Sequence, residues 1–413
     1  MLTTGLQLVD DETERREIRL RILSNLVEGT RAPRVKKEKV LKLDRNLLNR
    51  LPENNADLEN ALYECFLMAR RGKTRTVDEW NLDVFWAENI RQLAQDIIKR
   101  RWKPSSSKAF ISHSPVDREI FAAQFRDRMV HHLLYAVVAP WWNKRFIYDS
   151  YSCIRNRGTD FGVNRMQKFM RQVSRNGTRK AYVLKGDLSG YFMSLKRKTL
   201  YRKVMWGLRK QFPKGGWLFE LCRYLWREVI YDDPCLEARI VGKLNDWECL
   251  PSNKSLFCQP RGQGIVIGNL TSQLLSNIML NEFDWWMKKK MGFCYYGRYV
   301  DDFFIIVTKE ELDFAKSAML HEVPEKLRTM GLKMHPKKLY IQEVSHGCPF
   351  LGKMVRPFVL TPGKRYLRNM RKAFRDYVEG RASYETMQSY VGMGKHMAGY
   401  TEMKKVVSKL ESF

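Results

Sequence analysis

The sequence predicts an α+β fold that carries a helical extension at its N-terminus. Between residues 110 and 360, helical stretches alternate with short β-branched or aromatic runs such as 181–184 and 303–307, and this alternation is typical of α+β domains. Residues 57–102 repeat apolar side chains at helical spacing, and after Gly352 the pattern turns helical again. The chain is therefore expected to be helical, then mixed, then helical.

The N-terminal zone begins with residues 1–56, which contain no recognisable motif. Their first part alternates charges and spaces Ile and Leu as an amphipathic helix does, and a basic stretch follows at 31–42. In the next zone Leu58, Leu62 and Phe66 share one helical face. We expect a charged helical extension followed by packed helices, and the role of the extension stays open between binding RNA, binding a protein and being a tail.

The charge of the chain favours a polyanionic partner. Lys and Arg number 74 against 45 Asp and Glu in 413 residues, a formal net charge of +29, and each phosphate that Lys or Arg neutralises releases a condensed counterion. A basic solubilising surface is the alternative. No apolar run reaches the roughly 18 residues that span a bilayer, and no signal-peptide core follows Met1. The eight cysteines form no CxxC pair, so we expect reduced thiols in a cytoplasmic protein without membrane contact.

The most informative local pattern is the pair Asp301-Asp302. Strand-like runs flank it on both sides, at 295–300 and 303–307. Asp is a poor strand residue and a good turn residue, so the pattern predicts a hairpin with carboxylates at its tip. An Asp-Asp pair taken alone is more often a turn than a metal site, and a metal site requires a further acid.

Asp187 is the candidate for that further acid, because it lies at the C-terminal edge of the strand-like run 181–184. Two-metal phosphoryl transfer uses acids from different chain segments to hold two cations roughly 3.5–4 Å apart. Carboxylate oxygens are hard ligands that suit Mg²⁺. Asp187, Asp301 and Asp302 are therefore predicted to be catalytic ligands of two Mg²⁺ ions, with Mn²⁺ as a substitute.

Four motifs resemble those of reverse transcriptases and follow the order of that family. In chain order they are the first palm motif (Asp187 to Phe192), the (Y/F)xDD box (Tyr299-Val300-Asp301-Asp302), a segment that usually carries a lysine near the pyrophosphate (Gly331 to Lys338, with Lys337 and Lys338 as the candidates) and the hairpin that grips the primer (Phe350, Leu351 and Gly352). The resemblance covers roughly residues 110–400 and implies RNA-directed DNA polymerase activity.

The resemblance also implies a right-hand polymerase fold of the α+β class with an N-terminal helical extension. Its expected units are the extension (1–56), the fingers with preceding helices (57–180), the palm with some fingers elements (181–345), and the primer-grip hairpin with a helical thumb (346–413).

Two further residues match positions that contact the incoming nucleotide in this family. Arg118 matches a residue that reaches the triphosphate, where a positioned cation stabilises a departing pyrophosphate. Phe192 matches the aromatic gate under the sugar, where a bulky ring leaves no room for a 2′-hydroxyl and so favours deoxynucleotides. Without the family, Phe192 is equally well interpreted as a core residue.

The segment Ile267-Gly268-Asn269-Leu270-Thr271-Ser272-Gln273 indicates a subgroup. Most reverse transcriptases carry QGxxxSP here, and the (I/V/L)GxxxSQ form is the hallmark of enzymes from diversity-generating retroelements. The alternative interpretation of Gly268 is an ordinary loop-to-helix start, and both interpretations can hold together. Ile267, Gly268 and Gln273 are thus expected near the nascent base pair.

Membership of that subgroup implies error-prone cDNA synthesis from a template-repeat RNA, with targeted diversification of a gene. It implies as partners dNTPs, the RNA and its RNA/cDNA duplex, and a small basic accessory protein that assembles as a ring. An apolar Ile267 contributes shape but no hydrogen bond, so mispairs opposite template adenine lose less by comparison. We expect Ile267→Gln to change misincorporation at adenine.

Basic residues are frequent in the segment that follows the primer-grip hairpin. Apolar or aromatic residues recur at helical spacing from Tyr366 to Tyr377, and cations alternate with them. The cations predicted to contact nucleic acid are Lys364, Arg365, Arg368, Arg371 and Lys372. An ordinary solvated basic face is the alternative.

Three rival functions remain. Another bacterial reverse transcriptase, of the group II intron, retron or defence type, is disfavoured by Ile267 and Gln273. An RNA-dependent RNA polymerase is disfavoured by Phe192. A catalytically silent RNA-binding protein on a polymerase scaffold is disfavoured by the presence of all three acids.

Overall fold

The computed structural model describes residues 12–28, 55–71, 85–113, 116–395 and 397–412. The basic stretch at 31–42, singled out above, lies outside the described residues. None of the helices within the described ranges combines the length and the apolar character needed to cross a membrane.

The main sheet is four-stranded and antiparallel, with the strand order β5-β6-β3-β7. Its strands are β3 (Ala181–Asp187), β5 (Tyr296–Tyr299), β6 (Asp302–Thr308) and β7 (Tyr340–Glu343). Strands β5 and β6 form the hairpin that the paired aspartates predict. The register sets Asp187 directly opposite Asp302, so the two acidic motifs meet at one edge of the sheet.

Alternate residues of the central strands point to opposite faces of this sheet, and each face has its own core. Leu184, Phe303 and Ile305 belong to the large cluster that also contains residues of the helix α13 (Leu270–Trp285). The other face is covered by the helix α8 (Thr159–Val173), and its buried side chains form the second cluster. Burial on both faces explains why β6 is almost wholly apolar.

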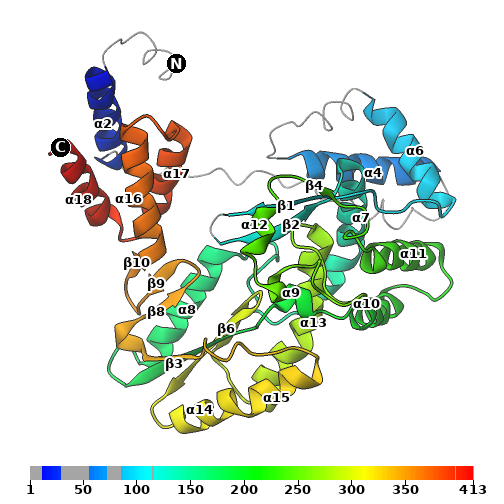
Figure 1. Cartoon of the computed structure of the whole chain (residues 1–413). Helices are drawn as coiled ribbons and strands as arrows, with labels where there is room; N and C mark the ends of the chain where they lie inside the picture. Colours follow the sequence, from blue (N-terminus) through cyan, green and yellow to red (C-terminus); the bar gives the residue numbers. More distant parts are fainter. Residues whose placement is uncertain (1–11, 29–54, 72–84, 114–115, 396, 413) are drawn as a thin grey trace.

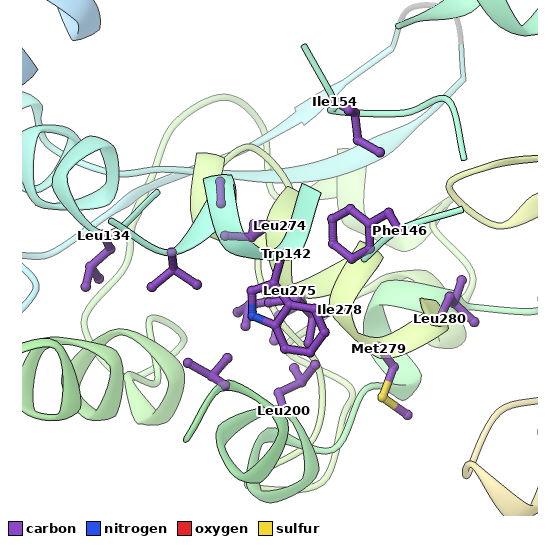
Figure 2. Packing of buried hydrophobic residues seen from close by; sticks show 14 of the residues in the cluster. Leu134, Trp142, Phe146, Ile154, Leu200, Leu274, Leu275, Ile278, Met279 and Leu280 are labelled. Atoms are coloured by element: carbon purple, nitrogen blue, oxygen red, sulfur yellow. The ribbon is translucent and has the colours of Figure 1, made fainter. Parts of the chain in front are cut away.

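The large cluster continues into the helices that precede and follow the sheet strands. These are α4 (Asn55–Arg70), α6 (Trp86–Ile98), α7 (Phe125–Asn143), α10 (Arg197–Gln211) and α11 (Trp217–Tyr231), with α14 (Leu312–Leu320) and α15 (Glu322–Thr329) beneath the sheet. Trp142 of α7, Leu200 of α10 and Leu275 of α13 belong to this cluster (Figure 2). The close approach of α10 depends on Gly207, because a Cβ there would lie 2.8 Å from Trp142 Nε1.

A small three-stranded sheet, β2-β1-β4, lies beside these helices. It contains β1 (Lys108–Ser112), β2 (Arg118–Ala122) and β4 (Arg239–Ile240). Two short helices pack against it, α9 (Tyr191–Ser194) and α12 (Asn245–Glu248). Buried Glu119 of β2 accepts hydrogen bonds from Trp247 Nε1 (2.8 Å), Ser255 Oγ (2.7 Å) and the backbone N–H of Leu256 (2.5 Å), which joins the loop after α12 to this sheet.

The C-terminal part forms a third core in which the N-terminal helix takes part. After β8 (Cys348–Phe350), β9 (Lys353–Val355) and β10 (Leu360–Pro362) come α16 (Lys364–Val378), α17 (Tyr384–Lys395) and α18 (Tyr400–Glu411). The helix α2 (Glu12–Glu28) packs on them with Leu20, Leu23 and Val27 buried. Arg19 Nη1 donates to the Val378 carbonyl at 3.3 Å, and Lys395 Nζ donates to that of Leu26 at 2.8 Å. The extension is helical here, as predicted, and its apolar face is buried against the other end of the chain.

Candidate active site

The hairpin between β5 and β6 turns at Val300, whose φ of +55° lies in the left-handed region. A β-branched residue is strained there, so its neighbours must hold it in place. Arg298 Nη1 donates to the Val300 carbonyl at 2.8 Å. This bond fixes the turn that carries Asp301 and Asp302.

Arg298 itself is held by a fully buried ion pair with Asp284 of α13, and both side chains are 0% exposed. The guanidinium donates from Nε to Asp284 Oδ1 (2.7 Å) and from Nη2 to Oδ2 (2.6 Å), a bidentate geometry. It also donates to Asn277 Oδ1 (3.3 Å) and Ser150 Oγ (3.2 Å). Burial alone would lower the pKa of Arg298, but Asp284 raises it on balance, so the cation is permanent.

The three carboxylates lie close enough to perturb one another. Burial, and then the charge of Asp187, raises the pKa of Asp301 to about 6. Burial raises the pKa of Asp302 to about 6 as well, against the opposing charge of Lys185. Asp302 Oδ1 is buried and has no hydrogen-bond partner among the described residues. The site therefore brings three carboxylates together where water has only partial access.

Two lysines from different segments contact these acids. Lys338 Nζ lies 2.6 Å from Asp187 Oδ2, and Lys185 Nζ lies 3.3 Å from Asp302 Oδ2. Of the two lysines proposed for the segment 331–338, the structure brings Lys338 to the acids, whereas Lys337 is exposed and its backbone N–H bonds to His335 Nδ1.

The donor set suits a divalent cation, although no three His, Cys, Asp or Glu side chains of the described ranges converge as a ready-made metal cluster. In this arrangement the ammonium groups of Lys338 and Lys185 contact two of the carboxylates. The buried, unpartnered oxygen of Asp302 and the raised pKa values of Asp301 and Asp302 are features that a bound cation would relieve. The residues fit Mg²⁺ or Mn²⁺ because all their donors are oxygens.

Phe192 and Ile267 lie on adjoining segments. Phe192 is half-buried on α9, and its carbonyl accepts from the backbone N–H of Ile265 at 3.1 Å. Half-buried Ile267 packs with the cluster around Phe121, and the N–H of Phe121 donates to its carbonyl at 3.4 Å. Backbone bonds at Ile265 and Ile267 therefore join this segment to α9 on one side and to β2 on the other.

The other residues predicted to contact the nucleotide are Gly268, Gln273 and Arg118. Gly268 has φ +122° and Gln273 is half-buried in the first turn of α13, which starts at Leu270. Arg118 is exposed at the start of β2. Burial raises the pKa of Tyr299, and the Arg118 charge acts against that rise.

The hairpin β8–β9 and α16 carry the remaining predicted residues. Phe350 is buried against the Phe304 ring at 5.2 Å between centroids, so its side chain packs on the sheet. Leu351 (φ +48°) and Gly352 (φ +81°) form the turn, in which Leu351 is half-buried and Gly352 is exposed. The predicted cations of α16 are all exposed, on the side opposite its buried face: Lys364, Arg365, Arg368, Arg371 and Lys372.

Comparison with known proteins identifies the family to which the chain belongs. Residues 117–355 match the reverse transcriptase (RNA-dependent DNA polymerase) family. The chain belongs to that family. It is therefore an RNA-directed DNA polymerase by class, with the mixed α and β polymerase fold that the sequence predicts, and enzymes of this family use divalent metal ions.

Individual relatives of this reverse transcriptase are distant. It is 24% identical to Protein YkfC of Escherichia coli strain K12 over 314 residues, which is 67% of this chain and 73% of that protein. Among solved structures it is similar to telomerase from Candida albicans in complex with a fragment of telomeric RNA (TM-score 0.44, 12% identity, 75% of this chain) and to apo telomerase from Candida tropicalis (0.42, 13%, 79%). It spans 58% and 62% of those two chains.

Three residues of the site escaped the sequence analysis of this reverse transcriptase. Arg298 and Asp284 support the turn, and Lys185 contacts Asp302. The available signal was a charged residue inside an apolar stretch, since Arg298 interrupts 295–300 and Lys185 interrupts the run that ends at Asp187. Asp284 lies 14 residues from Arg298 and Asp302 lies 117 residues from Lys185, so periodicity alone does not identify these pairs.

Proposed function

We propose that this reverse transcriptase synthesises error-prone cDNA from a template-repeat RNA for targeted gene diversification. The observation that carries the proposal is the segment Ile267-Gly268-Asn269-Leu270-Thr271-Ser272-Gln273 at the start of α13. It combines the subgroup sequence with a position beside Phe192 and Phe121. An apolar, half-buried Ile267 against the nascent pair offers shape without a hydrogen bond.

The chemistry assigned to the acids is two-metal phosphoryl transfer. Asp187, Asp301 and Asp302 would hold two Mg²⁺ ions, or Mn²⁺ in their place. Bound there, the metals would lower the pKa of the primer 3′-hydroxyl and stabilise the charge of the in-line transition state. The strained turn at Val300, held by Arg298, presents two of the three acids, and the register of β3 with β6 presents the third.

The surrounding residues position the nucleotide and the primer in this proposal. The Phe192 ring excludes the 2′-hydroxyl of a ribonucleotide. Arg118, with Lys338 released from Asp187, contacts the triphosphate and stabilises the departing pyrophosphate. The turn at Leu351-Gly352 contacts the primer end.

In this proposal the chain divides as the sequence leads us to expect: extension (1–56), fingers (57–180), palm (181–345), and hairpin with thumb (346–413). Figure 1 shows the α16–α18 helices and the α4–α7 helices on either side of the sheet region, an arrangement that suits a duplex lying between them. The exposed cations of α16 would contact phosphates of the RNA/cDNA duplex. We further propose a small basic ring-forming accessory protein as partner and the cytoplasm as location, since all eight cysteines are free.

The proposal is tested by sequencing cDNA made by the purified full chain on an RNA template, with Mg²⁺, dNTPs and the accessory protein. We expect errors concentrated at template adenines, and Ile267→Gln to reduce them there while other positions change little. Errors spread evenly over the four template bases would favour the intron, retron or defence type. Absence of any extension, with Asp301→Ala/Asp302→Ala indistinguishable from wild type, would favour the silent RNA binder.

A further inference from the structure

Lys185 connects two parts of the site that the sequence keeps far apart. It lies in β3 two residues before Asp187, so both side chains are on the same face of the sheet. Its Nζ donates to Asp302 Oδ2 at 3.3 Å and to the Pro349 carbonyl of β8 at 3.1 Å. One ammonium group thus joins a proposed metal ligand to the hairpin proposed to contact the primer.

The bond to Lys185 also orients the carboxylate of Asp302. Because Oδ2 takes the ammonium, Oδ1 is left buried and without a hydrogen-bond partner among the described residues. A buried oxygen of this kind is costly unless something else binds it. Oδ1 is therefore the Asp302 oxygen that remains for a cation while Lys185 occupies Oδ2.

Other side-chain contacts also hold the hairpin, one of them on the sheet and one on α8. Phe350 packs on Phe304, which is the cross-strand partner of Lys185. Lys353 Nζ of β9 lies 2.7 Å from Asp160 Oδ1 of α8. Both points hold the flanks of the hairpin, and only the Lys185 bond links its backbone to one of the three acids among the described contacts.

We propose that Lys185 is a positioning residue that sets the distance between the primer-binding hairpin and the Asp302 carboxylate. The inference rests on the proposed function, because it takes Asp302 as a metal ligand and the hairpin as a primer contact. Lys185 has an electrostatic cost in this role, since its charge opposes a metal ion bound beside Asp302. Alignment of the primer end with the metal site offsets that cost, because a misplacement of about 1 Å can lower a rate by roughly 100-fold.

We therefore expect Lys185→Met to strengthen metal binding and to slow catalysis. Without nucleic acid, Mn²⁺ should bind the variant about three- to tenfold more tightly than wild type, because a nearby unit charge is gone. On a primer–template with saturating metal, kcat should fall about tenfold or more. Lys185→Arg keeps the charge and the donors and should restore both values most of the way. Lys309→Met removes the same charge beyond the far end of β6 and should change neither.

Mn²⁺ binding is measured by the loss of the free-ion electron paramagnetic resonance signal, and folding by thermal unfolding of each variant. Weaker or unchanged Mn²⁺ binding by Lys185→Met, or an unchanged kcat, overturns the inference. Asp302→Asn tests the proposed metal site independently of Lys185. If Asp302→Asn weakens Mn²⁺ binding and Lys185→Met has no effect, the inference fails and the proposed function stands. If Asp302→Asn leaves Mn²⁺ binding unchanged, the proposed metal site itself fails.

Discussion

Replacing Arg298 by Met removes the cation from a fully buried ion pair and the donor from the Val300 carbonyl. The guanidinium makes five hydrogen bonds, three of them at 2.6–2.8 Å. Asp284 would be left as a buried, uncompensated charge, and breaking a pair in this way costs about 3–5 kcal/mol. We expect Arg298→Met to lower the free energy of unfolding by that amount.

The double variant Asp284→Leu/Arg298→Met separates stability from positioning. It removes both charges and leaves apolar groups, an exchange that is often neutral or stabilising for buried pairs, so we expect it to recover most of the lost stability. The Val300 carbonyl still lacks its donor, so the turn bearing Asp301 loses its support. We therefore expect primer extension to stay about 100-fold below wild type.

Urea unfolding and single-nucleotide primer extension measure the two quantities, with Tyr296→Phe as the control. That change deletes only the phenol bond to Asp284 (2.6 Å) and should cost about 1 kcal/mol with little loss of extension. Wild-type extension by the double variant would refute the reasoning, because it would show that Arg298 serves folding alone and that the turn needs no guanidinium.

Three further predictions concern other elements. Phe192→Ala should lower the KM for ribonucleotides in primer extension by about tenfold or more, and an unchanged preference for dNTPs would remove Phe192 as the gate. Changing Lys364, Arg368 and Lys372 to Ala should reduce the slope of log affinity against log salt for an RNA/DNA duplex by about 2–3; an unchanged slope would mean that this face of α16 is only solvated. The third concerns His131, whose Nδ1 lies 2.9 Å from Thr271 Oγ1 and whose pKa burial lowers from 6.5 to about 4. Because the folded state favours the neutral ring, stability is complete above pH 6.5 and falls by up to about 3 kcal/mol as the pH drops toward 4. His131→Gln should flatten that dependence in urea unfolding, and an equally steep curve would contradict it.

Local patterns were sufficient for much of the fold. The helical spacing of Leu58, Leu62 and Phe66 predicts the buried face of α4, and all three are buried. The apolar runs around Asp301-Asp302 predict the β5–β6 hairpin, which forms as expected. These features depend on neighbours in sequence, where periodicity and turn chemistry act directly.

The sequence by itself therefore determined the polymerase class, the family and the segments that carry the acids. Only the tertiary structure decided that Phe350 faces the sheet, that Arg298 supports the turn through Asp284, and that Lys185 lies between Asp302 and Pro349. It also decided that the N-terminal extension packs on the C-terminal helices. The physical reason is that a buried charge is costly unless an opposite charge or hydrogen-bonding group lies against it, and that the apolar face of a helix is stable only when it packs on other apolar residues. Such partners are often more than a hundred residues away in the sequence, as they are for Lys185, and a local sequence pattern does not predict them.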